Sequence, residues 1–277
     1  MEVSLPDPGA GVGRVREPGA RWGRPGGDGP ALVAAGRFVP RWMLAGLVAA
    51  LAAGALPAAT GERTVINAGR GGDTTADLLA RLEGDVLAQA PDLVVLLAGT
   101  NDRLNSPKAI PLAQYEENLR DLVRRIAARG AKVLLVTIPP AHEPYLLKRH
   151  PREFFGRERA EARIASVNDA VRRVARERAI PVVDFFAAVE NAGGASERAG
   201  SLIRNRENSG SEDGVHPTAK GYRLLGNLVA EAITREHLQD ARRIICFGDS
   251  ITRGVHMSGE GTATGETYPA FLLQALP

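Results

Sequence analysis

Residues 93–138 read LVVLLAGTNDRLNSPKAIPLAQYEENLRDLVRRIAARGAKVLLVTI, and this stretch decides the fold class. It opens and closes on short leucine and valine runs, Leu93 to Ala98 and Lys132 to Ile138, which are typical of β-strands. Residues 111–129 between them follow an amphipathic helical pattern, and Gly130 is a typical helix stop. Strands this apolar are expected to be parallel and covered on both faces. The stretch therefore predicts one β-α-β unit.

The same alternation continues on both sides of this unit. The predicted strands are Thr64 to Ala68, Leu93 to Ala98, Lys132 to Ile138, Pro181 to Phe185 and Arg243 to Phe247. The predicted helices are 74–89, 111–129, 157–178, 217–236 and 266–275. This pattern indicates an α/β fold with a doubly wound, mostly parallel five-stranded sheet. Such a sheet binds its ligands at the carboxyl ends of the strands.

The first 59 residues differ from the rest of the chain. Residues 1–41 are rich in Gly, Pro and Arg and are expected to form a disordered tail. Residues 42–59 are an apolar run that ends in small residues, as in a signal peptide, with an uncleaved membrane anchor or a surface helix as alternatives. Cleavage would make the protein secreted or periplasmic; otherwise it would be cytoplasmic or membrane-anchored. Residues 60–277 are expected to form one domain.

Charge and cysteine content exclude several classes of function. The formal net charge is only +3, and the arginines are spread over helix faces, so no nucleic-acid partner is expected. The one cysteine, Cys246, cannot form a disulfide within the chain, and its apolar neighbours indicate a buried core thiol. The five histidines show no metal-ligand spacing. Any membrane contact is expected only through residues 42–59.

Two polar segments could supply a nucleophile and its base. Gly248-Asp249-Ser250 follows the last predicted strand, where an exposed hydroxyl could attack an acyl carbon, although Gly-Asp-Ser is also a common turn. Asp213 and His216 are three residues apart, so the carboxylate could orient the imidazole as a base for Ser250. The alternative is a plain helix start, with Asp213 as cap and Pro217 in the first turn.

Two further segments could stabilise a developing oxyanion. Residues 67–75, NAGRGGDTT, follow the first strand, and their glycines could present backbone N–H groups. A phosphate-binding loop or a tight turn are alternatives, although the Lys-Ser/Thr ending of a P-loop is missing. Asn101 follows the next strand and could donate from its side-chain amide, or it could be an ordinary loop residue.

Together these segments resemble the sequence blocks of SGNH/GDSL hydrolases, a family of serine esterases and lipases with a flavodoxin-like fold. The resemblance covers residues 64–277 and carries Gly-Asp-Ser, Asn-Ala-Gly-x-x-Gly, Gly-Thr-Asn-Asp and Asp-x-x-His. It implies a catalytic triad of Ser250, His216 and Asp213. It also implies an oxyanion hole formed by the Ser250 amide, Gly72 and Asn101, with Gly72 chosen because it directly precedes Asp73-Thr74.

The order of the blocks departs from that family. Its members begin with the serine block, whereas this chain begins with the glycine block and ends with the serine block. We therefore expect a circularly permuted domain that closes within one chain, because residues 235–242 can bridge the helix before them and the strand after them. A swapped dimer and a misassembled reading frame are the alternatives.

The resemblance implies hydrolysis of carboxylic esters through an acyl-serine intermediate, without metal or organic cofactor. Candidate substrates range from small acyl esters and acetylated sugars to lysophospholipids and acyl thioesters. The loop 139–156 could shape an acyl pocket or be a solvated connector. The glycine-rich loop 257–267 could be a mobile lid or a flexible joint. A ligand-binding module without activity and an acyltransferase that uses an alcohol acceptor are the rival functions. A monomer is expected.

Overall fold

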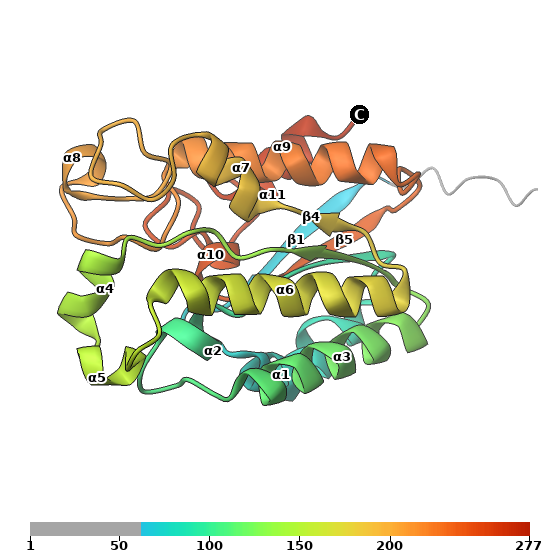
Figure 1. Ribbon diagram of the computed structural model, residues 1–277. Coiled ribbons are helices and arrows are strands. Elements are labelled where there is room, and N and C mark those ends of the chain that lie inside the picture. Colours follow the sequence, from blue (N-terminus) through green and yellow to red (C-terminus); the bar gives the residue numbers. More distant parts are fainter. Residues whose placement is uncertain (1–61) are drawn as a thin grey trace, which may run out of the picture. The chain divides into compact units, whose positions relative to one another are not determined.

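The computed structural model describes residues 62–277, in which a five-stranded sheet lies between two layers of helices (Figure 1). The predicted disordered tail, residues 1–41, and the predicted signal peptide or anchor, residues 42–59, lie outside the described residues. The strands are β1 Thr64–Gly69, β2 Leu93–Leu97, β3 Lys132–Val136, β4 Val182–Val183 and β5 Arg243–Gly248. Every pairing between them is parallel, so the predicted α/β fold is confirmed.

The order of the strands across the sheet is β1-β5-β2-β3-β4. The last strand of the chain is therefore inserted between the first two. If the strands are counted from β5 onward and then from β1, the order becomes 2-1-3-4-5, which is the flavodoxin-like arrangement. In this arrangement the carboxyl ends of β1, β5 and β2 lie next to one another, and all three carry predicted site segments.

Long helices cover both faces of the sheet (Figure 1). Helices α1 Thr75–Asp85, α3 Leu112–Ala128 and α6 Ala160–Arg178 lie on one face. Helices α9 Ala219–Arg235 and α11 Tyr268–Ala275 pack together on the other. The shorter helices are η1 Leu87–Gln89, α2 Thr100–Leu104, α4 Glu143–Arg149, α5 Arg152–Phe155, α7 Phe185–Asn191, α8 Arg206–Ser209 and α10 Ser250–Arg253. Within residues 62–277, no helix has the length and apolar character needed to cross a membrane.

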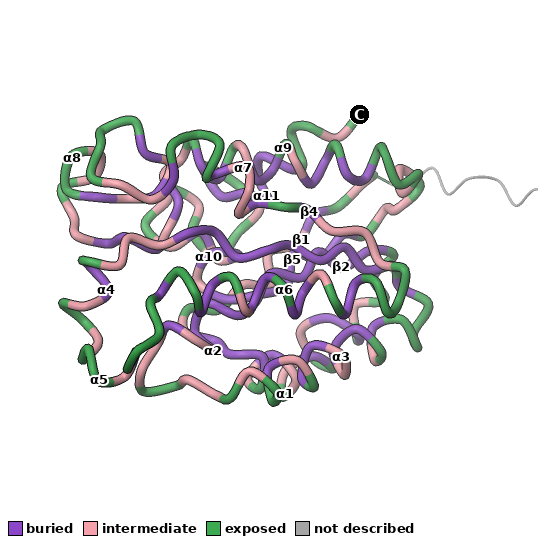
Figure 2. The backbone as a smooth tube through the Cα atoms, in the orientation of Figure 1, coloured by how far each residue is buried: buried purple, intermediate pink, exposed green. Residues whose placement is uncertain are grey.

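The strands at the centre of the sheet form the core. All five residues of β2 and the last five of β5 are buried, as Figure 2 shows for the middle of the sheet. Helix α3 contributes the fully buried Tyr115, and α9 and α11 contribute Tyr222 and Tyr268. Cys246 also lies in this core, where burial raises the pKa of its thiol to about 12. A thiolate nucleophile at this position is therefore unfavourable.

Several element boundaries differ from the sequence prediction. The predicted strand 181–185 is reduced to two residues, because the side chain of Asp184 accepts a hydrogen bond from Ala187 N–H and starts α7. The predicted helix 74–89 ends at Asp85 and continues only as η1. Helices α6, α9 and α11 begin two or three residues later than predicted. The predicted loop 139–156 is largely helical and contains α4 and α5, which start at or next to a proline.

The start of β1 lies beside the end of the chain. The guanidinium of Arg63 donates to Pro277 O at 2.6 Å, to Gln239 O at 2.7 Å and to Ala241 O at 3.3 Å. Residues 236–242, which join α9 to β5, therefore meet both segments at the amino edge of the sheet. This edge is opposite the one that carries the polar site segments.

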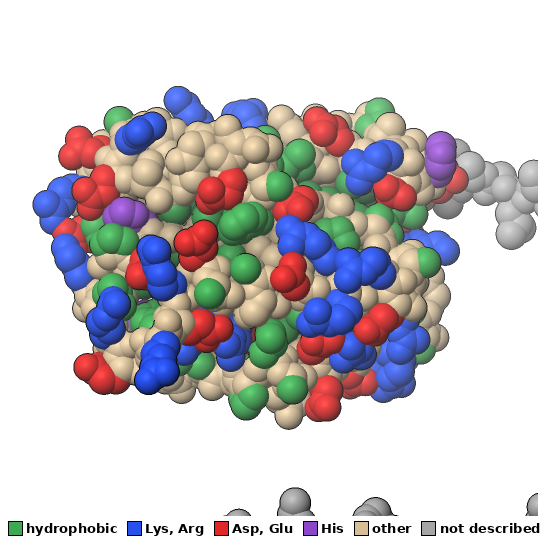
Figure 3. All heavy atoms as spheres, in the orientation of Figure 1, with side chains coloured by type: hydrophobic (Ala, Val, Ile, Leu, Met, Phe, Trp, Pro, Cys, Tyr) green, Lys and Arg blue, Asp and Glu red, His purple; other side chains and the backbone are tan. Residues whose placement is uncertain are grey.

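Several arginines on the long helices are paired with acidic side chains. On the face seen in Figure 3, basic and acidic groups are intermingled. Arg120 bonds to Glu177 at 2.8 Å, and Arg173 bonds to Glu116 at 2.9 Å. This pairing explains why basic residues are spread over the helices. That the protein has no nucleic-acid partner stays a prediction.

Candidate active site

Ser250 lies at the first position of α10, directly after β5. The side chain of Asp249 caps this short helix, because its Oδ1 accepts a hydrogen bond from Ile251 N–H at 2.9 Å. The cap turns the chain sharply, so the Ser250 side chain stands at the carboxyl edge of the sheet. Among residues 62–277, no acceptor binds the Ser250 backbone N–H, which leaves this donor free for a ligand.

Asp213 and His216 come from the loop before α9 and meet Ser250 from the other side. His216 Nε2 lies 2.9 Å from Ser250 Oγ, and His216 Nδ1 lies 2.8 Å from Asp213 Oδ2. The three side chains are thus linked in a row by hydrogen bonds, although Asp213 and Ser250 are 37 positions apart in the sequence. The alternative reading of Asp213 as a helix cap is wrong, because Thr218 caps α9.

Asp213 is held ionised by its surroundings. Burial by itself would raise the pKa of this carboxyl, but hydrogen bonds from the His216 ring and from the Val215 and His216 backbone N–H groups hold the pKa at about 2. Both backbone bonds end on Oδ1, at 2.9 and 2.8 Å. Arg204 adds a positive charge, with its Nε 3.9 Å from Asp213 Oδ2. A permanently charged carboxylate thus faces the imidazole.

The glycine-rich segment 67–75 is anchored to β5 by Arg81. This buried guanidinium donates to Asp73 Oδ2 at 2.6 Å, to Ala68 O at 2.9 Å and to Gly248 O at 2.9 Å. Gly69 must lack a side chain, since a Cβ there would lie 2.1 Å from Arg253 N in α10. The segments that contain Gly72 and Ser250 are therefore fixed relative to one another.

Gly72 and Asn101 meet at Asp73. Gly72 has a left-handed backbone with φ of +80°, and within the described part of the chain its N–H has no acceptor. The Asn101 amide donates to Asp73 O at 3.0 Å, and its own oxygen accepts from Asn105 at 3.0 Å. These two bonds fix the orientation of the amide and leave it a second N–H.

A cavity of about 420 Å³ lies in front of Ser250. Eleven of its fourteen lining residues have polar side chains, among them Asn101, His216 and Ser250, whereas Gly72 is not part of the lining. Of the predicted acyl-pocket loop 139–156, only Leu146, Arg149 and His150 reach this cavity. Tyr145 and Phe155 are instead buried, and His142 lines a different cavity. The prediction that the loop shapes the pocket thus holds for three residues at the end of α4.

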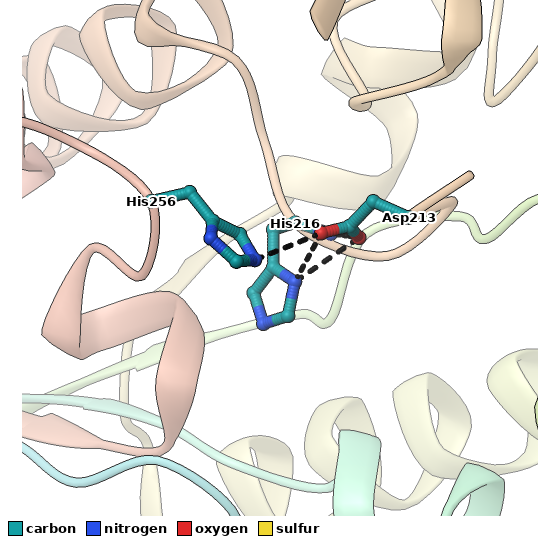
Figure 4. A group of neighbouring side chains, drawn as sticks. All are labelled: Asp213, His216 and His256. Carbon is teal, nitrogen blue, oxygen red and sulfur yellow. Dashed lines mark hydrogen bonds and ion pairs between the residues drawn. The ribbon is translucent and has the colours of Figure 1, made fainter. Parts of the chain in front are cut away.

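His256 was not singled out from the sequence, yet it lies beside the hydrogen-bonded pair of His216 and Asp213. Its Nε2 is 3.4 Å from Asp213 Oδ2, and its ring stands edge-on to that of His216 with the centroids 5.4 Å apart (Figure 4). Burial, followed by repulsion from His216, lowers the pKa of His256. Its place just after α10 carried no motif, so only the folded chain reveals it.

Asp249 should make stability depend on pH. It is fully buried, and burial raises its pKa from the ordinary 3.8 to about 7. Because the folded state then holds the proton more tightly than the unfolded chain, stability should fall as pH rises from 3.8 towards about 7, and level off above. Asp249→Asn keeps the oxygen that caps α10 but has no proton to lose.

Urea unfolding of both proteins between pH 4.5 and 8 checks this prediction. The wild type should lose more stability than Asp249→Asn between about pH 4.5 and 7, and the two stability curves should run parallel above that window. Parallel curves over the whole range would contradict the buried, protonated state of Asp249.

Comparison with known proteins places the chain in a family. Residues 33–224, more than half of the chain, match the GDSL-like Lipase/Acylhydrolase family. The chain belongs to this family. The resemblance drawn from the sequence blocks is thereby confirmed, and the protein is an esterase or lipase of the GDSL type. The matched range ends within α9, so the Ser250 block lies outside it.

The relatives of this GDSL-type esterase include both named enzymes and an uncharacterized protein. It is 30% identical over 177 residues to the uncharacterized lipoprotein YqeF of Bacillus subtilis, covering 60% of this chain and 71% of the relative. It is 37% identical over 92 residues to esterase TesA of Pseudomonas aeruginosa, covering 32% of this chain and 44% of the relative. A crystal structure of the lipase/acylhydrolase from Enterococcus faecalis is 31% identical with a TM-score of 0.48, covering 60% of this chain and 72% of that one.

Proposed function

We propose that this GDSL-type esterase hydrolyses carboxylic esters through an acyl-serine intermediate. The observation that carries the proposal is the hydrogen-bonded chain from Ser250 through His216 to Asp213. Ser250 Oγ attacks the ester carbonyl while His216 Nε2 takes its proton. His216 then protonates the leaving alcohol and activates the water that releases the acid. Asp213 holds the Nδ1 proton and stabilises the imidazolium.

The oxyanion formed during attack is stabilised by three donors. Two of them belong to residues that line the cavity, namely the free N–H of Ser250 and the second N–H of the Asn101 amide. The third is the free N–H of Gly72, which is assigned from the family pattern because Gly72 does not line the cavity. Preorganised donors of this kind act in the transition state more than on the bound ester. Asn101 is the one side chain among them, so it can be removed without touching the backbone.

Asn101→Ala is expected to lower kcat for p-nitrophenyl acetate by about 10² to 10³-fold, with KM nearly unchanged. Steady-state kinetics on the two proteins measure this change. Asn118→Ala is a control, because Asn118 also bonds into this region, through Thr75 Oγ1 at 3.1 Å, but does not line the cavity. A loss of less than threefold in Asn101→Ala would remove Asn101 from the oxyanion hole.

The cavity favours small acyl groups on polar alcohols. At about 420 Å³ it lies near the lower end for small-molecule sites, and only three of its lining residues, Leu104, Leu146 and Val215, have apolar side chains. Polar groups such as Asn105, Ser211 and Arg149 can bind hydroxyl-rich alcohols. We therefore place short-chain acyl esters, including acetylated sugars, ahead of lysophospholipids and long-chain acyl thioesters.

Turnover of p-nitrophenyl esters of increasing chain length tests this function. Acetate and butyrate esters should be hydrolysed by the wild type with a kcat/KM at least about tenfold above the dodecanoate ester. Addition of glycerol should not divert the acyl group into a glycerol ester. A rate that rises with chain length would overturn the substrate assignment, and a glycerol ester as main product would indicate an acyltransferase.

The order of the blocks is best explained by circular permutation. The flavodoxin-like order counted from β5 and the contact between Arg63 and Pro277 both support it. A rearranged chain with residues 240–277 first, a linker of about four residues and then residues 62–239 should fold and keep kcat/KM within about tenfold. An insoluble or inactive product, beside an active wild type, would contradict the permutation.

Export is proposed on the basis of residues 42–59. Their signal-like pattern and the naming of one relative as a lipoprotein support it. Amino-terminal sequencing of the protein made in a secreting host tests this: a start near Ala58 supports export, and an intact Met1 contradicts it.

A further inference from the structure

We propose that Asp213, His216 and His256 form a site for one divalent transition metal ion, such as Zn²⁺, and that binding there inhibits the esterase. The three side chains come from two separate segments that approach each other (Figure 4), and all three line the cavity. One ligand atom from each lies within 4.8 Å of the others. Two of the three ligands, Asp213 and His216, also belong to the catalytic triad, so a bound ion and the catalytic arrangement exclude each other.

The spacing of the donor atoms is close to what Zn²⁺ requires. Asp213 Oδ2 lies 2.8 Å from His216 Nδ1 and 3.4 Å from His256 Nε2. Two ligands bonded to Zn²⁺ at about 2.0 to 2.2 Å and at tetrahedral angles lie roughly 3.4 Å apart. A three-ligand site therefore needs His216 Nδ1 to move about 0.6 Å farther from Asp213 Oδ2. The His256 side chain, which is 49% exposed, is free to adjust with it.

The donor types favour a transition metal over magnesium or calcium. Two imidazole nitrogens and one carboxylate oxygen suit Zn²⁺, Cu²⁺ or Ni²⁺, whereas Mg²⁺ and Ca²⁺ prefer oxygen ligands alone. A fourth position stays open to water from the cavity. The guanidinium of Arg204, 3.9 Å from Asp213 Oδ2, opposes a cation, so reversible binding is expected.

The backbone holds His256 in this position. Its φ is +71°, a left-handed value that residues with a side chain rarely adopt. Its N–H donates to Glu260 at 3.2 Å, and Arg253 holds the same carboxylate at 2.7 Å. The imidazole is therefore presented towards Asp213 before any ion arrives.

Metal binding should inhibit by changing the tautomer of His216. In the active form Nδ1 carries the proton towards Asp213, and the Nε2 lone pair faces Ser250. A metal ion bonded to Nδ1 takes the lone pair of that nitrogen, so the single ring proton must sit on Nε2. His216 can then no longer accept the proton of Ser250. This part of the inference rests on the proposed function, whereas the binding itself does not.

Calorimetric titration of ZnCl₂ into Ser250→Ala tests the site independently of activity, because all three ligands remain. One ion per chain should bind, MgCl₂ should not bind, and adding His256→Asn should weaken Zn²⁺ binding at least about tenfold. His237→Asn is the matched control, since His237 is exposed and has a φ of +56°. Asparagine tolerates this backbone at both positions.

Inhibition of p-nitrophenyl acetate hydrolysis forms the second arm. Zn²⁺ should inhibit the wild type, and EDTA should restore its rate. The rate of each protein is expressed relative to its own rate without metal. On this scale, His256→Asn should need at least about tenfold more Zn²⁺ for half-inhibition than the wild type. Absence of binding to Ser250→Ala, or equal binding in the His256→Asn background, would overturn the site. Binding without inhibition would overturn the role of His216 as a ligand. An inactive wild type that still binds Zn²⁺ through His256 would count against the proposed function alone.

Discussion

Ser250→Ala is expected to lower kcat for p-nitrophenyl acetate by at least about 10⁴-fold. Ser250 Oγ is the atom that becomes acylated. Neither His216 nor Asp213 can replace it as the nucleophile, because His216 serves as its base. His216→Ala should cause a loss of similar size, because an unassisted serine hydroxyl is a weak nucleophile. The double variant should be no worse than either single variant, since the two residues act as one unit.

Mixing the two inactive variants provides a control for chain assembly. Ser250 and His216 are hydrogen-bonded within one chain, so an equal mixture of Ser250→Ala and His216→Ala should stay inactive. Recovery of activity would indicate that the serine block completes the site of a neighbouring chain. Circular dichroism should show that both variants are folded. Full activity in Ser250→Ala would contradict the account directly.

Asp213→Asn is expected to reduce kcat by about 10⁴-fold with little change in KM. The Val215 and His216 N–H groups donate to Oδ1, at 2.9 and 2.8 Å, so the asparagine oxygen should take that position. The NH₂ group then replaces Oδ2, which lies 2.8 Å from His216 Nδ1. It donates to Nδ1 and places the ring proton on Nε2, which is the wrong tautomer for a base.

Steady-state kinetics of Asp213→Asn beside Asp240→Asn measure this effect. Asp240 is exposed in the segment between α9 and β5, so its replacement should leave kcat unchanged. Retention of more than about a tenth of the wild-type kcat in Asp213→Asn would show that the carboxylate does not set the tautomer.

Much of the fold could be predicted because its signals are local. The leucine and valine runs at 93–97 and 132–136 are long enough to identify strands, and the helices between them carry a clear apolar period. β4 was overestimated because Asp184 can either extend a strand or cap a helix, and its bond to Ala187 N–H favours the helix. Helices α4 and α5 are short and lack a long apolar period, so the pattern predicted a loop.

The candidate site could be predicted only where its residues lie in short motifs. Asp213 and His216 are three residues apart, and Ser250 follows Gly-Asp, so each was visible in the sequence. His256, Arg204 and Arg81 act across long separations and carry no motif. Arg81, for example, reaches Gly248 O over 167 residues, a contact that exists only where β1 and β5 lie side by side. The position of β5 between β1 and β2 agrees with the permuted flavodoxin-like fold that the family resemblance implied.

Covalent labelling with a fluorophosphonate ester tests most directly whether Ser250 is a nucleophile activated by His216. The reagent reacts with an activated serine hydroxyl and releases fluoride, so the labelled residue can be located by mass spectrometry of proteolytic peptides. The account predicts one label per chain, on Ser250, and almost none in folded His216→Ala. A label on another residue, or equal labelling of Ser250 with and without His216, would contradict it.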